Sequence, residues 1–210
     1  MINVIIADDH PIVRAGLKQI IMEDRDITVA GEASNGAELL THIRRRDYDV
    51  ILLDLTMPGM DGLDVLKQLK IEKPHTPVII LTIHPESQYA LRILKAGASG
   101  YLTKESASDE LIKAIRKVQG GGKYISPSLA EKIAFALDGD AGKPPHESLS
   151  DREYQVLCLI GSGKTVSQIA DALSLSVKTV STYRTRILEK MHMQNNAELI
   201  HYTVQNSLVD

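Results

Sequence analysis

The sequence has few cysteines, no long apolar run and little net charge. Its single cysteine, Cys158, excludes a disulfide within the chain and any zinc site built from cysteines. No apolar run approaches the roughly 20 residues of a membrane helix. No charged segment followed by an apolar one opens the chain either, so we expect a cytoplasmic protein with no membrane partner. The net charge of −3 excludes a uniformly basic surface for nucleic acid, so any contact with DNA requires a local excess of positive charge. The seven histidines show no metal-ligand spacing and are interpreted as scattered polar positions.

The first 119 residues alternate short apolar, β-branched runs with segments of helical period. This alternation predicts an α/β fold, a doubly wound five-stranded parallel sheet with helices on both faces. The third and fourth runs are continuously apolar, which is typical of central strands buried on both sides. The expected strands are 2–7, 27–33, 49–54, 77–82 and 99–103, and the expected helices are 11–23, 35–46, 62–72, 86–96 and 107–119.

The rest of the chain has a different pattern. A short amphipathic segment at 128–137 precedes 138–148, which is rich in Gly, Pro and Asp and lacks an apolar period, as is typical of a linker. From Leu149 onward there is no strand signal, which predicts a smaller all-α domain. We therefore expect one domain over 1–120, a linker with a short helix over 121–148, and a second domain over 149–210. Its four helices are expected at 151–161, 166–173, 177–190 and 196–206.

Charged and hydroxyl side chains stand where the predicted strands end. In an open parallel sheet, ligands bind beyond the carboxyl ends of the strands. Three carboxylates at one edge would repel each other, and a divalent cation that prefers oxygen, such as Mg²⁺, relieves that repulsion. With a lysine and a hydroxyl beside them, these carboxylates suit the transfer of a phosphoryl group to an aspartate. The residues at the strand ends are Asp8, Asp9, Asp54, Thr82 and Lys104.

Taken singly, most of these residues have a simpler explanation. Asp9 can be a helix N-cap, Thr82 a residue of high β-propensity and Lys104 an exposed lysine. Asp54 is harder to explain in this way, because it ends a fully apolar strand. The prediction of a phosphoryl-transfer site therefore depends on the agreement of four strand ends.

Four stretches, IIADDHPIVRAGL, DVILLDLTMPGMDGLDVL, VIILT and GASGYLTK, together resemble the receiver domain of bacterial two-component response regulators, over residues 1 to about 120. The resemblance implies a flavodoxin-like fold in which Asp54 accepts a phosphoryl group from the phosphohistidine of a sensor histidine kinase. It also implies that Mg²⁺ is held by Asp8, Asp9, Asp54 and the backbone carbonyl of Thr56.

The same resemblance assigns roles to side chains around the phosphoryl group. Lys104 would pair with the phosphoryl oxygens, Thr82 would swing to hydrogen-bond them, and Tyr101 would rotate inward to fill the vacated space. One departure is Glu105, which follows the lysine where many receivers have proline. The cis-proline turn of those receivers therefore does not carry over, whereas the role of the lysine does.

The segment 177–190 has two different faces when it is read as a helix. The side with Val177, Val180, Ile187 and Met191 is apolar except for Arg184, and we expect it to be core. The opposite side carries small hydroxyls with basic residues around them. Small side chains let a helix approach base edges in the major groove while Lys and Arg meet phosphates. The alternative is a solvated helix face. The polar side consists of Lys178, Ser181, Thr182, Thr185, Arg186 and Glu189.

This segment also supplies the local charge that the whole chain lacks. Four basic residues between 177 and 190 face one acidic residue, Glu189. The signatures LSDRE, SQIADALSLSVKTV and ILEKM resemble the LuxR-type helix-turn-helix of the NarL/FixJ family, over residues 149–208. The resemblance implies binding to double-stranded promoter DNA. Tyr183 stands where that family frequently has histidine. The residues expected to contact DNA are Lys178, Thr179, Ser181, Thr182, Thr185 and Arg186.

The combined pattern predicts a phosphorylation-switched transcription factor and not an enzyme. Phosphatases of the haloacid-dehalogenase class also phosphorylate an aspartate, but they need a second acid where this chain has Thr56. A nucleotide-binding domain would have a Gly-rich turn after the first strand, where DDHP stands instead. The third alternative is a receiver that is controlled without phosphorylation, which the intact set of strand-end residues disfavours.

The switch is expected to work through association. Phosphorylation would shift a pre-existing equilibrium and expose a dimerisation face of the receiver. The homodimer would then bind two half-sites about one helical turn, or a small multiple of it, apart.

Overall fold

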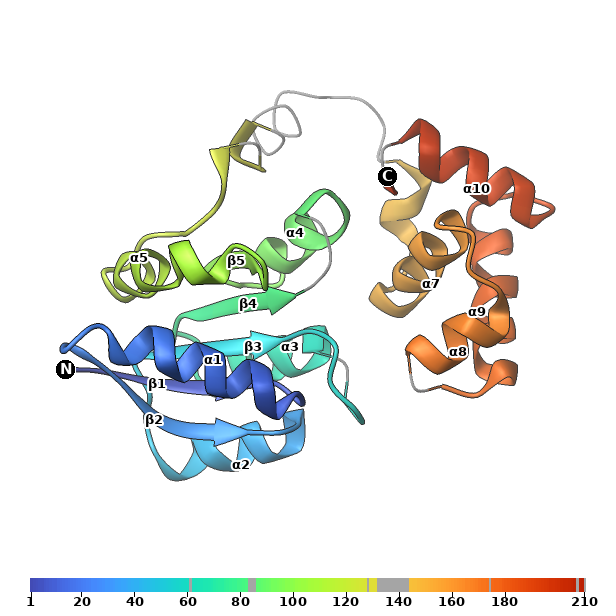
Figure 1. Cartoon of the computed structure of the whole chain (residues 1–210). Coiled ribbons are helices and arrows are strands. Elements are labelled where there is room, and N and C mark those ends of the chain that lie inside the picture. The colour runs from blue at the N-terminus through green and yellow to red at the C-terminus, as the bar shows by residue number, and fades with distance from the viewer. Residues whose placement is uncertain are drawn as a thin grey trace. The chain divides into compact units, whose positions relative to one another are not determined.

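The computed structural model describes residues 1–60, 62–82, 86–127, 129–131, 144–173, 175–206 and 208–209, with only the backbone described at 86–89 and 91. The chain divides into two compact units, Met1–Ile133 and Ala134–Asp210 (Figure 1). Most of the amphipathic segment predicted at 128–137, and residues 138–143 of the predicted linker, lie outside the described residues. None of the described helices is long and apolar enough to cross a membrane.

The first unit is built on a five-stranded parallel sheet with the strand order β2-β1-β3-β4-β5, and the strand arrows in Figure 1 point the same way. The predicted doubly wound α/β fold is therefore confirmed, and every predicted bound agrees with the structure to within one residue. The elements are β1 Ile2–Ala7, α1 Pro11–Met22, β2 Ile27–Ala33, α2 Gly36–Arg45, β3 Val50–Asp54, α3 Gly62–Glu72, β4 Val78–Thr82, α4 Glu86–Lys95, β5 Gly100–Thr103 and α5 Ala107–Gln119.

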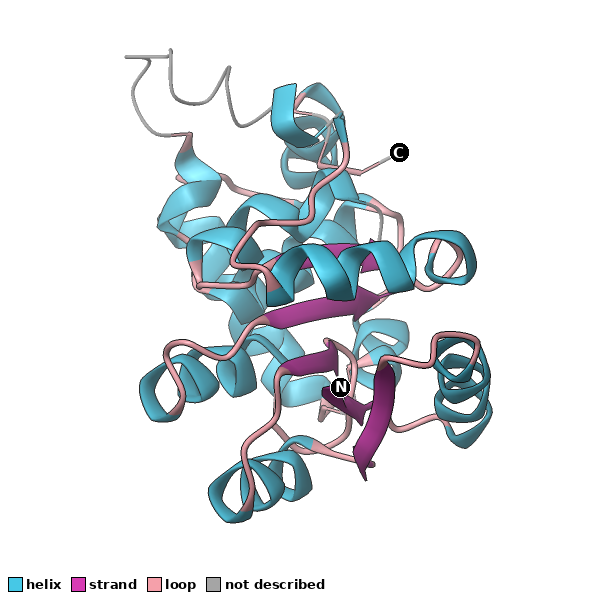
Figure 2. Ribbon diagram, turned by 90° about the vertical axis from the view of Figure 1, so that its left-hand side faces the viewer, coloured by secondary structure: helices cyan, strands magenta, loops and turns pink. Residues whose placement is uncertain are grey.

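Both faces of the sheet are covered, as the continuous apolar strands predicted. Val4 and Leu52 belong to one core cluster with Leu17 of α1 and Leu111 of α5. Because side chains alternate along a strand, Ile51 points to the other face, and it is also fully buried. Helices lie on both sides of the strands in Figure 2. The central strands thereby hold their carboxyl ends in fixed positions.

The chain returns to the edge of the sheet after α5. The N–H of Tyr124 donates to the carbonyl of Ser99 at 2.8 Å, and the N–H of Tyr101 donates to the carbonyl of Tyr124 at 3.2 Å. The approach is close, because a Cβ on Gly100 would lie 3.3 Å from the side chain of Tyr124. The first residues of the predicted linker are thus attached to β5.

The second unit contains the predicted bundle of α-helices around a small core, which includes Val156, Ile169, Val180, Ile187 and Leu199. Residues 145–148, predicted as part of a linker, instead form a 3₁₀ turn. Proline at its first position supplies the helical φ angle. The elements are η1 Pro145–Ser148, α7 Asp151–Gly161, α8 Val166–Ala172, α9 Val177–Lys190 and α10 Asn196–Gln205.

Glu153 connects the start of α7 to the end of α9. Its carboxylate accepts the backbone N–H of Ser150 at 2.7 Å, and Ser150 caps the helix in return, which is the reciprocal capping box. Lys190 lies 2.6 Å from the same carboxylate. Burial alone would raise the pKa of Glu153, but these partners outweigh it and hold the pKa below its ordinary value.

We expect Glu153→Gln to lower the free energy of unfolding of the second unit by about 2 kcal/mol at pH 7, because a charge-assisted pair and half of a cap are lost. A carboxylate whose pKa is depressed by folding stabilises above its unfolded value and loses that effect as the pH falls through the folded value. The difference from the wild type should therefore shrink below pH 4.5. Hydrogen exchange of α7 and α9, at pH 7 and at values below pH 4.5, measures this difference in the free energy of unfolding. The exposed Glu189→Gln is the control, and an equal change in both variants would contradict the assignment.

Candidate functional site

Asp8, Asp9 and Asp54 meet at the carboxyl edge of the sheet. Ala7 of β1 is paired with Leu53 of β3, so the residues that follow them on the two strands lie side by side. β1 has β2 on one side and β3 on the other, which makes this the topological switch point where doubly wound sheets bind ligands. The structure therefore brings the three predicted carboxylates together at the place where the fold forms a ligand site.

Lys104 reaches back over this edge from the residue after β5. Its ammonium lies 2.7 Å from Asp8 Oδ2 and 2.8 Å from Asp54 Oδ2. Both carboxylates are buried, and only 1% of Asp54 is exposed. The second oxygen of Asp54, Oδ1, accepts the backbone N–H of Thr56 at 3.2 Å. Each oxygen of Asp54 therefore has a donor, and one of the donors carries a charge.

Burial and ion pairing act in opposite directions on the pKa values of this group. Burial raises the pKa of Asp54, and it exceeds the lowering by Lys104, while the charge of Asp8 adds to the raising. Burial alone would lower the pKa of Lys104, but its bonds to the two aspartates raise it above its ordinary value. The lysine is therefore a stable cation held between two carboxylates.

A glycine that the sequence reasoning did not single out shapes the loop after Asp54. The N–H of Gly62, at the start of α3, donates to the carbonyl of Leu55 at 3.2 Å. A Cβ at this position would lie 2.5 Å from the Cα of Leu55, a backbone atom that cannot turn away. Only glycine lets α3 begin this close to the end of β3. The signal in the sequence was the glycine itself, at the first position of a predicted helix.

The site's oxygen atoms fit a divalent cation. Asp8, Asp9, His10 and Asp54 each offer a ligand atom, and these atoms lie within 4.8 Å of one another. Within the described part of the chain, Asp8 Oδ2 and Asp9 Oδ1 are buried and accept no hydrogen bond of good geometry, although Lys104 and His10 stand 2.7 Å away. Buried carboxylate oxygens without such bonds are typical ligands for Mg²⁺. His10, one of the seven histidines interpreted as scattered polar positions, lies in this cluster.

A hollow of about 180 Å³ opens beside Asp54. It is lined by His10, Val13, Asp54, Thr56 and Lys104. A buried carboxylate and a cation that line the same hollow leave space for a small anion beside the carboxylate.

Thr82 and Tyr101 lie on neighbouring strands beside this site. Thr82 ends β4 and is fully buried, while Tyr101 pairs with Ile80 two residues earlier on the same strand. Since side chains two apart share a face, the hydroxyl of Thr82 and the ring of Tyr101 are on the same side of the sheet. Tyr101 is already inward in this structure, with 1% of its surface exposed.

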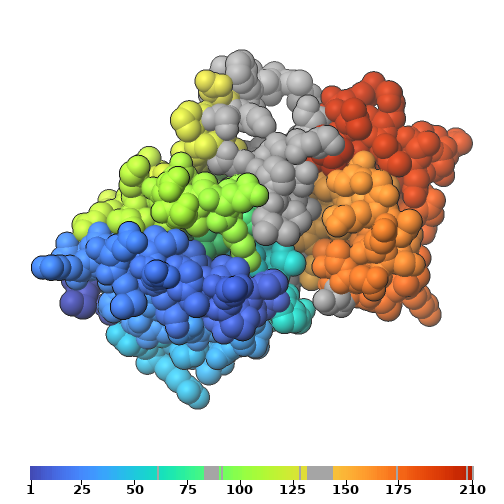
Figure 3. Space-filling model, viewed as in Figure 1, coloured from blue at the N-terminus to red at the C-terminus, as the bar shows by residue number. Residues whose placement is uncertain are grey.

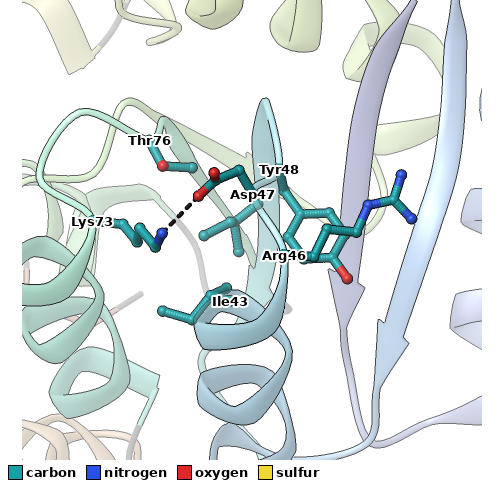
Figure 4. A pocket seen from close by; sticks show the side chains of 7 residues that line it. Ile43, Arg46, Asp47, Tyr48, Lys73 and Thr76 are labelled. Carbon is teal, nitrogen blue, oxygen red and sulfur yellow. Dashed lines mark hydrogen bonds and ion pairs between the residues drawn. The ribbon is translucent and has the colours of Figure 1, made fainter.

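A second hollow lies at the opposite edge of the sheet, near the start of β3 (Figure 4). Its wall contains an ion pair of 2.6 Å between Lys73 and Asp47, and the guanidinium of Arg46 lies over the ring of Tyr48. The hollow has no space for a water molecule. Its residues therefore serve packing between α2, β3 and the α3–β4 loop.

Helix α9 exposes the polar face that the sequence predicted. Figure 3 draws the helices of the second unit in orange to red. The hydroxyls of α9 are bonded to the helix itself. Ser181, Thr182 and Thr185 each donate to the carbonyl four residues earlier, at 2.9, 3.0 and 3.1 Å. Outward they therefore present acceptor oxygens and, for the threonines, methyl groups. The oxygens can accept hydrogen bonds from the amino groups of cytosine or adenine, and the methyl groups can contact the methyl group of thymine.

Helix α9 exposes fewer unpaired cations, among the described residues, than the sequence indicated. Arg184 turns toward α10, where its Nε donates to Asn196 Oδ1 at 2.5 Å. Lys190 forms an ion pair with Glu153. Among the described residues, Lys178 and Arg186 are the exposed cations of this helix that have no ion pair. The predicted charge excess on the surface therefore comes mainly from these two.

One position of the predicted core face is wrong. Val180, Ile187 and Met191 are buried, whereas Val177 is 50% exposed. Val177 is the first residue of α9 and precedes the part of the helix that packs on the core. Ser176 caps the helix at this end, because its side chain accepts the backbone N–H of Thr179. The hydroxyl of Thr179 lies 2.8 Å from that of Ser176, so this predicted DNA contact is part of the capped turn.

Comparison with known proteins gives two family matches. Residues 4–116 match the response regulator receiver domain, and residues 147–203 match the bacterial regulatory proteins of the luxR family. Response regulator UvrY of Escherichia coli is 37% identical over 209 residues, which is 99% of this chain and 96% of that protein. Response regulator GacA of Pseudomonas aeruginosa is 37% identical over 211 residues, covering 100% of this chain and 99% of that protein.

A solved structure resembles the chain over both units. It is RcsB of Salmonella enterica serovar Typhimurium bound to promoter rprA in the presence of phosphomimetic BeF₃⁻. The sequence identity is 30%, the TM-score is 0.66, and the alignment covers 96% of this chain and 97% of that one.

Proposed function

Because the chain belongs to the NarL/FixJ family of two-component response regulators, with a receiver domain and a LuxR-type DNA-binding domain, we propose that phosphorylation of Asp54 controls its binding to promoter DNA. The protein is a transcriptional response regulator of a two-component system. The observation that supports Asp54 as the acceptor is its place, buried in the lining of the hollow with Lys104 on one oxygen. We propose domain limits of 1–120, 121–148 and 149–210.

The phosphoryl group moves from a kinase histidine to the aspartate. The bond from phosphorus to an imidazole nitrogen breaks as a bond from phosphorus to a carboxylate oxygen of Asp54 forms. Lys104 and the N–H of Thr56 already contact that carboxylate and stabilise the negative charge brought to it. The hydroxyl of Thr82 would bind a phosphoryl oxygen, and Tyr101 would keep the space beside it filled.

Mg²⁺ would be held by the side chains of Asp8, Asp9 and Asp54 and the backbone carbonyl of Thr56. When bound, it would neutralise charge on the phosphoryl oxygens. Thr56 stands where a phosphatase would need a second acid, so Asp54 acts as an acceptor and not as the nucleophile of an enzyme.

DNA binding is assigned to α9. Its contacts would come from Lys178, Thr179, Ser181, Thr182, Thr185 and Arg186, with the two cations on phosphates and the hydroxyl face toward base edges. Two exposed cations bind DNA weakly, whereas two linked copies gain effective concentration. We therefore propose a homodimer on phosphorylation that binds two half-sites about 34 Å, or a small multiple, apart. The partners are a sensor histidine kinase and double-stranded promoter DNA, and we propose that the protein acts in the cytoplasm.

Intact mass after incubation with acetyl phosphate and Mg²⁺ tests the proposal. The wild type should gain one phosphoryl group, Asp54→Ala none, and the control Asp64→Ala, which changes an exposed aspartate of α3, should behave as the wild type. The labelled protein should then sediment as a dimer and bind promoter DNA more tightly. Labelling of Asp54→Ala to the wild-type level would refute the acceptor, and full DNA binding by a labelled monomer would refute the dimer.

A further inference from the structure

His10 adds an imidazole to the carboxylate cluster. Its Nδ1 lies 2.7 Å from Asp9 Oδ1 and 3.4 Å from Asp8 Oδ1, while its backbone N–H donates to Asp8 Oδ1 at 2.8 Å. The residue stands at the N-cap of α1, before Pro11, and its side chain is 59% exposed. The backbone bond and the fixed start of the helix hold the ring at the entrance to the cluster.

The spacing of these atoms matches that of neighbouring ligands around one ion. An octahedral ion with bonds of about 2.1 Å has adjacent ligand atoms roughly 3.0 Å apart and opposite ones roughly 4.2 Å apart. The two distances from His10 Nδ1 fall around the first value, and the whole set lies within 4.8 Å. Asp9 Oδ1 is buried and accepts no hydrogen bond of good geometry from the residues that the structure describes, although the ring stands beside it. The two atoms are therefore placed as ligands of a common ion.

We propose that His10 Nδ1 is a ligand of the metal site and that it raises the affinity of the site for imidazole-binding ions such as Ni²⁺ and Zn²⁺ relative to Mg²⁺. Carboxylate and carbonyl oxygens suit Mg²⁺, whereas an imidazole nitrogen suits Ni²⁺ and Zn²⁺. The proposal rests on the metal site of the proposed function and assigns it a specificity. A transition ion held in this way occupies the cluster next to Asp54 at concentrations where Mg²⁺ does not.

Calorimetric titration of the full-length protein with Ni²⁺ and with Mg²⁺ measures the two affinities. His10→Gln removes the imidazole nitrogen and keeps a side chain of similar length with an amide oxygen that can bind a metal ion. We expect it to weaken Ni²⁺ binding at the site by about tenfold or more and to change Mg²⁺ binding by less than about twofold. The control is His75→Gln, which changes an exposed histidine in the α3–β4 loop and should leave both affinities unchanged.

Two results would overturn the proposal. If His10 only positions Asp9, then His10→Gln lowers both affinities by the same factor. If nickel binds histidines of the surface without selection, then His75→Gln loses as much affinity as His10→Gln. Phosphorylation of Asp54 is measured separately by mass in Mg²⁺. If His10→Gln shows the selective loss of Ni²⁺ affinity but the wild type gains no phosphoryl group, the proposed function is contradicted and the ligand assignment stands.

Discussion

Replacing Lys104 with methionine is expected to lower the free energy of unfolding of the receiver by about 3 kcal/mol when no divalent metal is present. The ammonium is the cation between two buried carboxylates, at 2.7 Å from Asp8 and 2.8 Å from Asp54. Without it, two buried carboxylates remain side by side, and their charges repel each other. Methionine keeps the length and the apolar stem of the side chain, so the loss reports the charge.

Added Mg²⁺ should reverse most of this loss. A divalent ion at the cluster supplies the positive charge that the lysine provided, and it no longer competes with an ammonium for Asp8 Oδ2 and Asp54 Oδ2. We therefore expect the Lys104→Met protein to bind Mg²⁺ more tightly than the wild type and to gain more stability from it. Its phosphorylation by acetyl phosphate should be slower, because the lysine also offsets charge on the phosphoryl oxygens.

Hydrogen exchange of β1, β3 and β4 in the full-length protein, with and without Mg²⁺, separates the receiver from the second unit. The control is Lys18→Met. Lys18 pairs with Glu32 at 2.8 Å, but 39% of each side chain is exposed, so its loss should change stability by less than about 0.5 kcal/mol. The lysine would not be the cation of the cluster if the two substitutions changed the free energy of unfolding equally. The same would follow if the stability of the Lys104→Met protein did not change with Mg²⁺.

The strands and α-helices of both units could be predicted because their signals are local, whereas the 3₁₀ turn at 145–148 was predicted as linker. Apolar runs and helical periods fix which face of each segment is buried, and the bounds agree to within one residue. The carboxylate cluster followed from one global rule, that parallel strands end at a common edge. Asp8 and Asp54 are far apart in the sequence but follow paired residues of adjacent strands.

Pairings between side chains of different elements could not be predicted in the same way. Lys190 is bonded to Glu153 and Arg184 to Asn196, so two of the basic residues counted for DNA on α9 are used within the domain. No spacing rule relates residues on different helices, because their separation depends on how the helices pack. The place of His10 beside the carboxylates was not predicted for a related reason, since it comes from the geometry of the β1–α1 turn and not from a spacing in the sequence.

The exposed cations of α9 allow a specific prediction for the affinity for DNA and its dependence on salt. Replacing both Lys178 and Arg186 with alanine removes four cations from a dimer. The slope of log affinity against log salt should then fall by roughly 3 to 4, and the affinity at low salt should fall by about 100-fold or more. Because these contacts are to phosphates, the loss should be similar for a selected sequence and for an unrelated duplex.

The hydroxyl face should respond differently. Thr182→Val and Thr185→Val keep the methyl group and remove the acceptor oxygen, so they should change which sequences are preferred while leaving the salt dependence near that of the wild type. Fluorescence anisotropy with the phosphorylated protein measures both effects, on a duplex selected by the wild type from a random library and on an unrelated one. Arg45→Ala with Lys113→Ala removes the same charge from exposed positions of the receiver and is the matched control. If that control weakens binding as much as the α9 pair does, net charge and not this helix determines the affinity. If the threonine variants keep the wild-type preference, the base contacts lie on other residues.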